Sequence, residues 1–327
     1  MAQPPLTEPL RIGSVEIRNR VLLAPLAGIG NWFVRLQAYR YGAGMAFSEM
    51  VSSFALAHRN RRTLGEMLRI HPDEGVVAIQ LFGCDPQVMR VAAATAAEAG
   101  PQLLDLNMGC PVPKVVKTGA GAALLRDHDR AVALARAAIE GSGLPVTVKL
   151  RSGSAPGDRS GVELAERLVA DAGVAAVTLH PRPATVQHRG APDYALVREL
   201  AGRLEVPVIV SGGAGSAEGA QAAYERSGAD AVMIARGSLG YPWIFAELTA
   251  AADPPSPAEI EDELRWLLER AEQHWGPARA ARNLRKFYPW YVRPLGFEGR
   301  DADRFQRTES LDQVRELLAQ TPVAASL

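Results

Sequence analysis

The segment from Leu103 to Leu125 reads LLDLNMGCPVPKVVKTGAGAALL and combines a strand pattern with a group of reactive side chains. Its first five residues form a short apolar run followed at once by turn-forming residues, which is typical of a buried strand that ends at Asn107. Two prolines then stiffen the loop that carries Cys110. Lys114 and Lys117 come next. An amide, a thiol and two cations in one loop predict a functional site at the end of this strand.

The composition limits the class of protein. The chain has 327 residues, 47% of them hydrophobic, which is enough for one large α/β domain and a smaller one. Lys plus Arg and Asp plus Glu both number 36, so the formal net charge is zero and any nucleic-acid binding must rest on local patches. Only Cys84 and Cys110 are present, and no long apolar segment occurs, so we expect a cytoplasmic protein without a membrane span. We interpret Cys84 as an incidental small residue.

Short apolar runs alternate with helical patterns along most of the chain. The apolar runs cover residues 21–24, 45–49, 76–81, 103–107, 146–150, 176–180, 206–211 and 231–235. The helical patterns cover residues 86–99, 129–140, 162–172, 194–203 and 216–227, and many begin at Asp, Ser or Pro and end at Gly. Eight such alternations predict an α/β fold, a (β/α)8 TIM barrel. An open doubly wound sheet is the alternative, but no GxGxxG motif follows the first run.

Polar residues stand where the predicted strands end, which is where barrel enzymes place their active sites. They are Glu49, Gln80, Asn107, Lys149, Arg151, His180, Arg182, Ser211 and Arg236. The last two strands end in Ser211-Gly212-Gly213 and Ala235-Arg236, whose backbone N–H groups and guanidinium favour a bound phosphate group. The alternative is that these glycines only form tight turns.

A proline-rich linker at residues 252–258 separates a predicted barrel domain at 1–251 from a predicted helical domain at 259–327. We expect helices at 259–273 and 277–292. Basic and aromatic residues alternate between Arg279 and Arg293, with no acidic residue among them. Arg282, Arg285 and Lys286 would share one helical face and present a basic stripe to a phosphate backbone. The alternative is a solvated face opposite an aromatic core side.

The segment from Asn107 to Leu125 closely resembles the part of the bacterial tRNA-dihydrouridine synthases that carries their proton-donor cysteine. These flavoenzymes reduce uridine in tRNA. The resemblance, nearest to the B-type subgroup, continues at residues 24–28, 48–51, 80–83, 148–151 and 233–245. The segment at 282–286, with Trp290 and Tyr291, resembles the helical tRNA-binding domain of the family.

The resemblance implies FMN as cofactor, NADPH or NADH as electron source and tRNA as partner. Cys110 would donate a proton to C5 of the uracil while hydride goes to C6. The residues implied to hold FMN are Pro25, Leu26, Ala27, Gln80, Lys149, Ser211, Gly212, Gly213, Ala235 and Arg236. Lys149 is the candidate cation beside N1 and O2 of the flavin, and we count it as catalytic.

Further roles follow from side-chain chemistry. A thiol suits an acid, although Lys114 and Lys117 favour the thiolate, so the form of Cys110 stays open. Asn107 can bind flavin or uracil. His180 is a candidate for flavin contact and catalysis, with a structural histidine as the alternative. Lys114, Lys117, Arg182, Arg282, Arg285 and Lys286 are the candidate tRNA contacts.

Three positions depart from the family pattern. Leu26 replaces a usual Met, Ser211-Gly212-Gly213 replaces Asn-Gly-Asp, and His180-Pro181-Arg182-Pro183 replaces His-x-Arg-Thr. A dihydroorotate-dehydrogenase-like enzyme for free pyrimidines and a tRNA-binding protein without turnover are the competing functions. The basic tail argues against the first. We expect a monomer that needs no metal, since no cluster has metal-ligand spacing.

Overall fold

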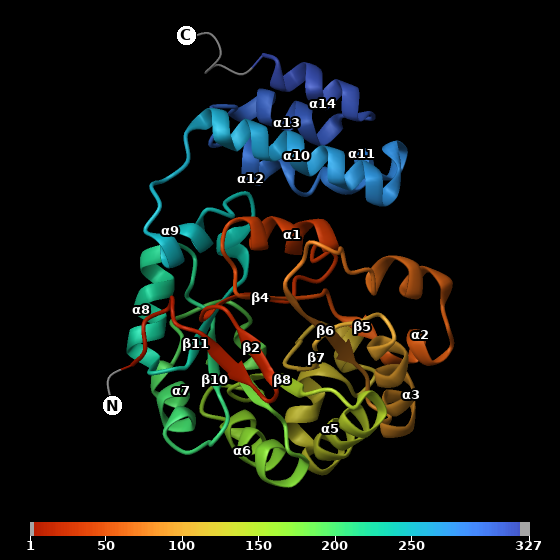
Figure 1. Cartoon of the computed structure of the whole chain (residues 1–327), viewed down its shortest axis with the longest axis vertical. Helices are drawn as coiled ribbons and strands as arrows, with labels where there is room; N and C mark the ends of the chain where they lie inside the picture. Colours follow the sequence, from red (N-terminus) through yellow and green to blue (C-terminus); the bar gives the residue numbers. More distant parts are fainter. Residues whose placement is uncertain (1–2, 321–327) are drawn as a thin grey trace.

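The computed structural model describes residues 3–320, which form a closed parallel barrel and a group of helices beside it (Figure 1). The barrel strands are β3 (Val21–Leu23), β4 (Met45–Phe47), β6 (Val76–Phe82), β7 (Leu103–Met108), β8 (Val146–Arg151), β9 (Ala176–His180), β10 (Val208–Ser211) and β11 (Ala231–Ile234). Neighbouring strands pair in parallel in the order β4-β3-β11-β10-β9-β8-β7-β6, and β4 also pairs with β6. That last pairing closes the ring, so the predicted TIM barrel is confirmed and the open-sheet alternative is wrong.

Three short strands lie outside the predicted alternation. β1 (Leu10–Ile12) and β2 (Val15–Ile17) form an antiparallel hairpin. Gly13 makes its turn with a φ of +56°, in the left-handed region that glycine tolerates. The hairpin buries Ile12 and Ile17 in one cluster with residues of the barrel strands, including Phe47. The third extra strand, β5 (Val51–Ser52), pairs with the end of β6.

The outer helices sit where the sequence patterns place them. They are α3 (Pro86–Ala97), α5 (His128–Ser142), α6 (Ser160–Arg167), α7 (Tyr194–Ala201) and α8 (Ala217–Ser227), with the shorter α2 (Ser53–Ala57), α4 (Pro113–Val116) and α9 (Ile244–Ala250) between them. Asp85, Asp127, Asp193 and Ser216 accept backbone N–H groups at the first turns, as N-caps do. The predicted helix at 162–172 continues α6 as a π-helix from Leu168 to Ala172.

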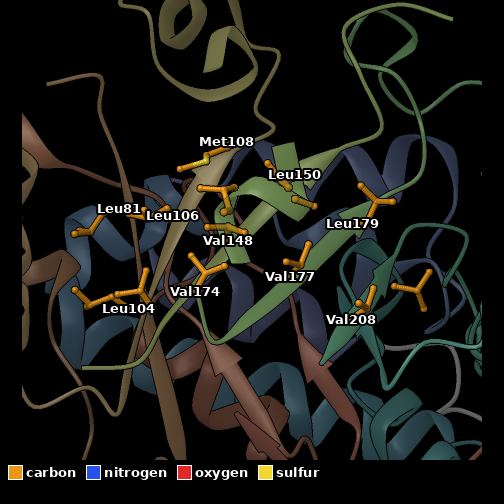
Figure 2. Packing of buried hydrophobic residues seen from close by; sticks show 14 of the residues in the cluster. Leu81, Leu104, Leu106, Met108, Val148, Leu150, Val174, Val177, Leu179 and Val208 are labelled. Carbon is orange, nitrogen blue, oxygen red and sulfur yellow. The ribbon is translucent and has the colours of Figure 1, made fainter. Parts of the chain in front are cut away.

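Apolar side chains from adjacent strands pack against one another and against the outer helices. Figure 2 shows Leu104, Leu106, Val148 and Val177 in this layer, and all four side chains are at most 2% exposed. Strands buried on both faces read as continuous apolar runs in the sequence. The layer fixes the barrel and hence the positions at which the strands end.

Five helices follow the linker: α10 (Pro257–Trp275), α11 (Pro277–Leu284), α12 (Tyr288–Val292), α13 (Gly299–Arg307) and α14 (Leu311–Leu318). The predicted single helix at 277–292 is wrong, because the chain turns at residues 285–287. Pro289 explains the break, since it has no N–H group to donate to the carbonyl of Arg285. The predicted domain boundary stays a prediction.

The helix α1 (Trp32–Arg40) belongs to the barrel in sequence, but it packs into the core of the C-terminal helices. A buried polar cluster also joins α1 to α10. The carboxylate of Glu263 accepts hydrogen bonds from Gln37 Nε2 at 2.8 Å, Tyr41 Oη at 2.7 Å and Arg40 Nη1 at 3.0 Å. The two parts of the molecule are therefore held by both apolar and polar contacts. None of the helices within residues 3–320 is long and apolar enough to cross a membrane.

Candidate active site

A cavity of about 730 Å³ opens at the carboxyl ends of the barrel strands. Its lining includes the following residues predicted from sequence: Pro25, Leu26, Ala27, Asn107, Cys110, Lys149, His180, Arg182, Ser211, Gly212, Gly213, Ala235 and Arg236. These residues come from six different strand exits, and the fold brings them to one place. Their individual roles stay predictions.

Gln80 lies beneath the cavity, outside its lining, and is 1% exposed. The strand register explains its surroundings, because Gln80 is opposite Asp105 on β7 and Asp105 is opposite Thr147 on β8. Gln80 Nε2 donates to Asp105 Oδ2 at 2.6 Å, and Thr147 Oγ1 donates to Asp105 Oδ1 at 2.6 Å. The carboxyl of Asp105 thus accepts from both neighbouring strands. Sequence analysis missed this residue, although a single acid inside the apolar run LLDLN was a visible sign.

The hydrogen bonds continue upward from Gln80 to the Cys110 loop. Asn107 Nδ2 donates to Gln80 Oε1 at 2.9 Å, and Asn107 Oδ1 accepts the backbone N–H groups of Cys110 at 3.0 Å and Gly109 at 3.3 Å. The carboxyl of Asp105 accepts from the amide nitrogen of Gln80, which leaves Oε1 of Gln80 to accept from Asn107. The loop that carries Cys110 is therefore oriented from the layer below.

Glycine is also required on the other side of the Cys110 loop. Gly121 has a φ of +61°, and a Cβ there would lie 2.7 Å from the carbonyl oxygen of Cys110. That carbonyl accepts the N–H group of Ala122 at 3.0 Å. The glycine after the Cys110 segment thus allows the chain to return close to the cysteine and hold it.

Lys149 stands opposite Asn107 on the neighbouring strand. Burial, and after it the charge of Arg151, lower the pKa of Lys149 to about 8, while Asp105 and Cys110 oppose the shift. At neutral pH the ammonium remains the main form, although its proton is held less tightly than that of a solvated lysine. Burial raises the pKa of Asp105 to about 7 against the hydrogen bonds from Gln80 and Thr147.

His180 is a neutral imidazole in this environment. Burial lowers its pKa far below the ordinary range, and the nearby cations Lys149, Arg151 and Arg182 act in the same direction. Arg182 Nη1 lies 3.2 Å from His180 Nε2. A guanidinium has no acceptor, so Nε2 accepts this hydrogen bond and the ring proton is on Nδ1. His180 can therefore offer one N–H donor but is not an acid at physiological pH.

Arg151 and Arg182 hold the loop that follows β9. Arg151 is 5% exposed and donates to the backbone oxygens of Gln187 at 2.6 Å and Pro183 at 3.2 Å. Arg182 Nε donates to the carbonyl of Gly190 at 3.0 Å. This loop brings His188 into the cavity lining, a residue that sequence analysis did not single out.

The glycines after β10 form a backbone cradle. Gly212 has a φ of +101°, and a Cβ there would lie 2.7 Å from the His180 ring. Gly213 has a φ of +87°, and its Cβ would lie 2.0 Å from Tyr194 Oη. Side chains are excluded at both positions, so backbone groups line this part of the cavity, next to Arg236. Such a site suits a phosphate group.

The expected tRNA contacts come from separate elements of the fold. Lys114 and Lys117 are exposed on and beside α4, outside the cavity lining. Arg285 donates to the carbonyl of Thr308 at 2.7 Å, and Lys286 Nζ donates to the carbonyl of Gly28 in the barrel. The predicted stripe of Arg282, Arg285 and Lys286 is therefore wrong as a shared helical face. Arg282 is exposed on α11, and whether these cations touch tRNA stays a prediction.

The helical part of the chain reaches the cavity through Trp290 of α12, which is part of the lining. Gly240 permits this contact, because its φ is +71° and a Cβ there would lie 2.5 Å from Trp290 Cβ. Nothing in the local sequence of Trp290 specifies that it reaches the barrel mouth. Among residues 3–320 no group of three or more His, Cys, Asp or Glu side chains could hold a metal ion.

Comparison with known proteins gives a consistent family. The family model described as "Dihydrouridine synthase (Dus)" matches residues 22–323. The chain is 36% identical over 306 residues to tRNA-dihydrouridine synthase B of Escherichia coli (strain K12) and 35% identical to that of Pectobacterium carotovorum. Each alignment covers 91% of this chain and 93% of the relative.

Solved structures of other proteins share the barrel. A morphinone reductase in complex with tetrahydroNAD aligns with a TM-score of 0.55 at 17% identity and covers 78% of this chain and 93% of that protein. A 2-naphthoyl-CoA reductase complex aligns with a TM-score of 0.60 at 12% identity and covers 75% of this chain and 52% of that protein. At these identities the likeness concerns the fold.

Proposed function

Because the chain belongs to the dihydrouridine synthase family, we propose that it reduces the C5–C6 bond of uridines in tRNA, with FMN as hydride carrier and NADPH as electron source. One observation carries the proposal. The cavity brings Cys110 together with Lys149 and with the glycine cradle after β10, so an acid, a cation and a phosphate site share one space.

The residues present fit FMN. Gly212 and Gly213 leave a backbone cradle that a Cβ would fill, and Arg236 lines the same end of the cavity. These groups would hold the phosphate, while Pro25, Leu26 and Ala27 would cover one side of the flavin ring. Asn107 and Lys149 would hold its polar edge. The bound flavin supplies the hydride.

The chain's own residues supply charge, orientation and a proton. Lys149 keeps a positive charge where negative charge develops. His180, held neutral, offers Nδ1–H as a donor without releasing a proton. Asn107 fixes the backbone of Cys110, and the Sγ–H of Cys110 gives its proton to C5 of the uracil. Reduction of the double bond is then complete, and solvent must return a proton to the thiolate.

The competing functions are distinguished by the substrate. The family assignment argues against a free-pyrimidine enzyme, and Trp290 adds to this because a helical domain forms part of the cavity mouth. A tRNA-binding protein without turnover would have the same cavity but would not transfer electrons to tRNA.

An absorption experiment tests the proposal. The purified protein with FMN should show flavin bands that bleach with NADPH under nitrogen and return when unmodified tRNA is added. Free uracil or orotate should not restore the bands. Bands that stay bleached in the presence of tRNA would refute the proposed reaction.

A variant tests the role of Cys110. Cys110→Ala should bind FMN and oxidise NADPH with oxygen as before, because the thiol does not hold the flavin, but it should form no dihydrouridine. Cys84→Ala is the matched control and should retain full activity. Dihydrouridine formation at the wild-type rate by Cys110→Ala would remove this thiol from the mechanism.

A further inference from the structure

An exposed pair of aromatic rings lies on α2. Phe54 is 63% exposed, and its ring stacks on that of His58 with the centroids 4.0 Å apart and an angle of 29° between the planes. His58 Nδ1 lies 2.8 Å from the carbonyl oxygen of Phe54, which keeps the two rings together. The core does not need Phe54, because Ser53 and Leu56 are the residues that α2 buries. The Phe54 ring therefore has an exposed face on which another flat ring can stack.

Three arginines follow this pair of rings in the chain. Arg59, Arg61 and Arg62 follow α2 and are all exposed. Arg62 pairs with Glu66 at 3.4 Å, and Glu66 also accepts two hydrogen bonds of 2.8 Å from Arg279 of α11. No side chain within residues 3–320 forms a hydrogen bond or ion pair with the guanidinium of Arg59 or Arg61. The nearby acid is thus already neutralised, and two guanidinium groups remain for an anionic partner.

The patch formed by Phe54, His58, Arg59 and Arg61 follows the carboxyl end of a barrel strand, the end at which the cavity opens. β5 pairs with β6 at Leu81 and Phe82, the end of β6 that points to the site, and α2 begins directly after β5. Met50 Sδ lies 3.8 Å from Asn107 Nδ2. Phe54 is four positions after Met50, so the Cα atoms of these two residues are at most about 14 Å apart. Phe54 therefore lies within about 14 Å of Met50, a residue that contacts Asn107 of the cavity lining.

The patch is continuous with the helical domain. Glu66, in the π-helix Thr63–Met67 that follows α2, holds Arg279, and Arg282 is exposed one turn further along α11. In Figure 1, α2 projects at the right-hand edge of the barrel and α11 lies above it on the same side. A polyanion that enters the cavity can therefore touch the barrel rim and α11 together.

We propose that Phe54 and His58 form a stacking platform for an unpaired base of the tRNA substrate, and that Arg59 and Arg61 bind the phosphates beside it. This inference rests on the proposed function. Proteins read single-stranded RNA by stacking splayed bases on aromatic rings, with cations along the backbone. Both elements are present here within eight residues of chain, from 54 to 61. The platform would hold the arm of tRNA that delivers the reactive uridine.

Binding of an unmodified tRNA transcript to the full-length protein tests the platform. Phe54→Ala should raise the Kd by about 5- to 150-fold, the range for loss of one base stack, and Phe54→Trp should keep the wild-type Kd. Arg59→Gln with Arg61→Gln should lower the slope of log Kd against log salt by about 1.5, since each phosphate contact contributes about 0.7 to 0.9. All these positions are exposed, so the fold does not depend on them.

Two variants away from the patch are matched controls. Val91→Ala trims another exposed apolar side chain, 52% exposed on α3. Arg11→Gln removes an exposed cation from β1, in the N-terminal hairpin. Both should bind tRNA as the wild type does.

Turnover by the wild type tests the proposed function separately from the stacking platform. If wild-type flavin is reoxidised by tRNA and Phe54→Ala has an unchanged Kd, the platform is wrong while the proposed function holds. If wild-type flavin is not reoxidised, the proposed function fails, and the Kd values alone decide whether the patch binds RNA. A sedimentation coefficient that changes in Phe54→Ala while the Kd does not would make the patch a contact between copies of the chain and would overturn the inference.

Discussion

Asp105→Asn removes an ionisable group beneath the cavity and keeps the size of the side chain. Asp105 has no exposed surface, and its carboxyl accepts from Gln80 Nε2 and Thr147 Oγ1. Burial raises the pKa of Asp105 from 3.8 to about 7, and the two hydrogen bonds only partly oppose this shift. Asparagine resembles the protonated acid, because it is neutral and has one acceptor oxygen.

The sign of the pH effect follows from the raised pKa. The folded protein holds the proton of Asp105 more tightly than the unfolded chain does, so the free energy of unfolding falls as the pH rises from about 4 to about 7. One pKa unit corresponds to about 1.36 kcal/mol. Between pH 5 and pH 8 the carboxyl should therefore cost about 2 to 3 kcal/mol of stability. Asparagine has no proton to lose, so Asp105→Asn should lack this part of the pH dependence.

Urea denaturation followed by tryptophan fluorescence measures the difference. The free energy of unfolding of Asp105→Asn minus that of the wild type should increase by about 2 to 3 kcal/mol from pH 5 to pH 8. Thr147→Val is the companion variant. It removes a donor that favours the ionised form, so it should raise the pKa of Asp105 further and steepen the loss. A difference between Asp105→Asn and the wild type that does not change with pH would refute the raised pKa.

Two further predictions concern the cavity wall. Since burial lowers the pKa of Lys149 to about 8, uridine reduction should slow above about pH 8, and Lys149→Arg should move this decline to higher pH. A decline at the same pH in the variant would exclude Lys149 as its cause. Gly212→Ala should weaken FMN binding by about 5- to 150-fold in a flavin fluorescence titration, because a positive φ and the His180 ring both oppose a Cβ, with a strain of about 1 to 3 kcal/mol. Gly190 also has a positive φ, of +71°, but no atom lies within 4 Å of a Cβ there, so Gly190→Ala is the control for backbone strain alone. An equal loss of FMN affinity in both variants would contradict the role of Gly212 in the phosphate cradle.

The barrel could be predicted from sequence because its strands are buried on both faces. Such strands read as continuous apolar runs, so a run like VVAIQLF at β6 stands out against the helical patterns around it. Polar residues at strand exits stand out for the same reason, since a polar group at a buried position needs a partner or a function. Hence Asn107, Lys149 and His180 could be identified and do meet in one cavity.

Other features depend on contacts between distant segments. The hairpin of β1 and β2 has strands of three residues, too short for a clear alternation. The helix expected at 277–292 is two helices, because Pro289 lacks the N–H group that would continue the hydrogen bonding of α11. His188 reaches the cavity because of the path of the loop after β9. Trp290 reaches it because the C-terminal helices pack against the barrel. Phe54 carried no pattern at all, because exposure is a property of the folded surface.

The cavity is built by both parts of the chain, which links RNA binding to chemistry. Trp290 of α12 forms part of its wall, Lys286 donates to the carbonyl of Gly28 in the loop after β3, and Gly240 leaves room for the backbone of Trp290. The C-terminal helices therefore contact the loops that would cover the flavin. Because a tRNA arm bound across α11 and the barrel rim would span this junction, a change in the domain contact should alter both the affinity for tRNA and the position of the uridine over Cys110. A binding surface tethered by the linker alone would affect affinity only.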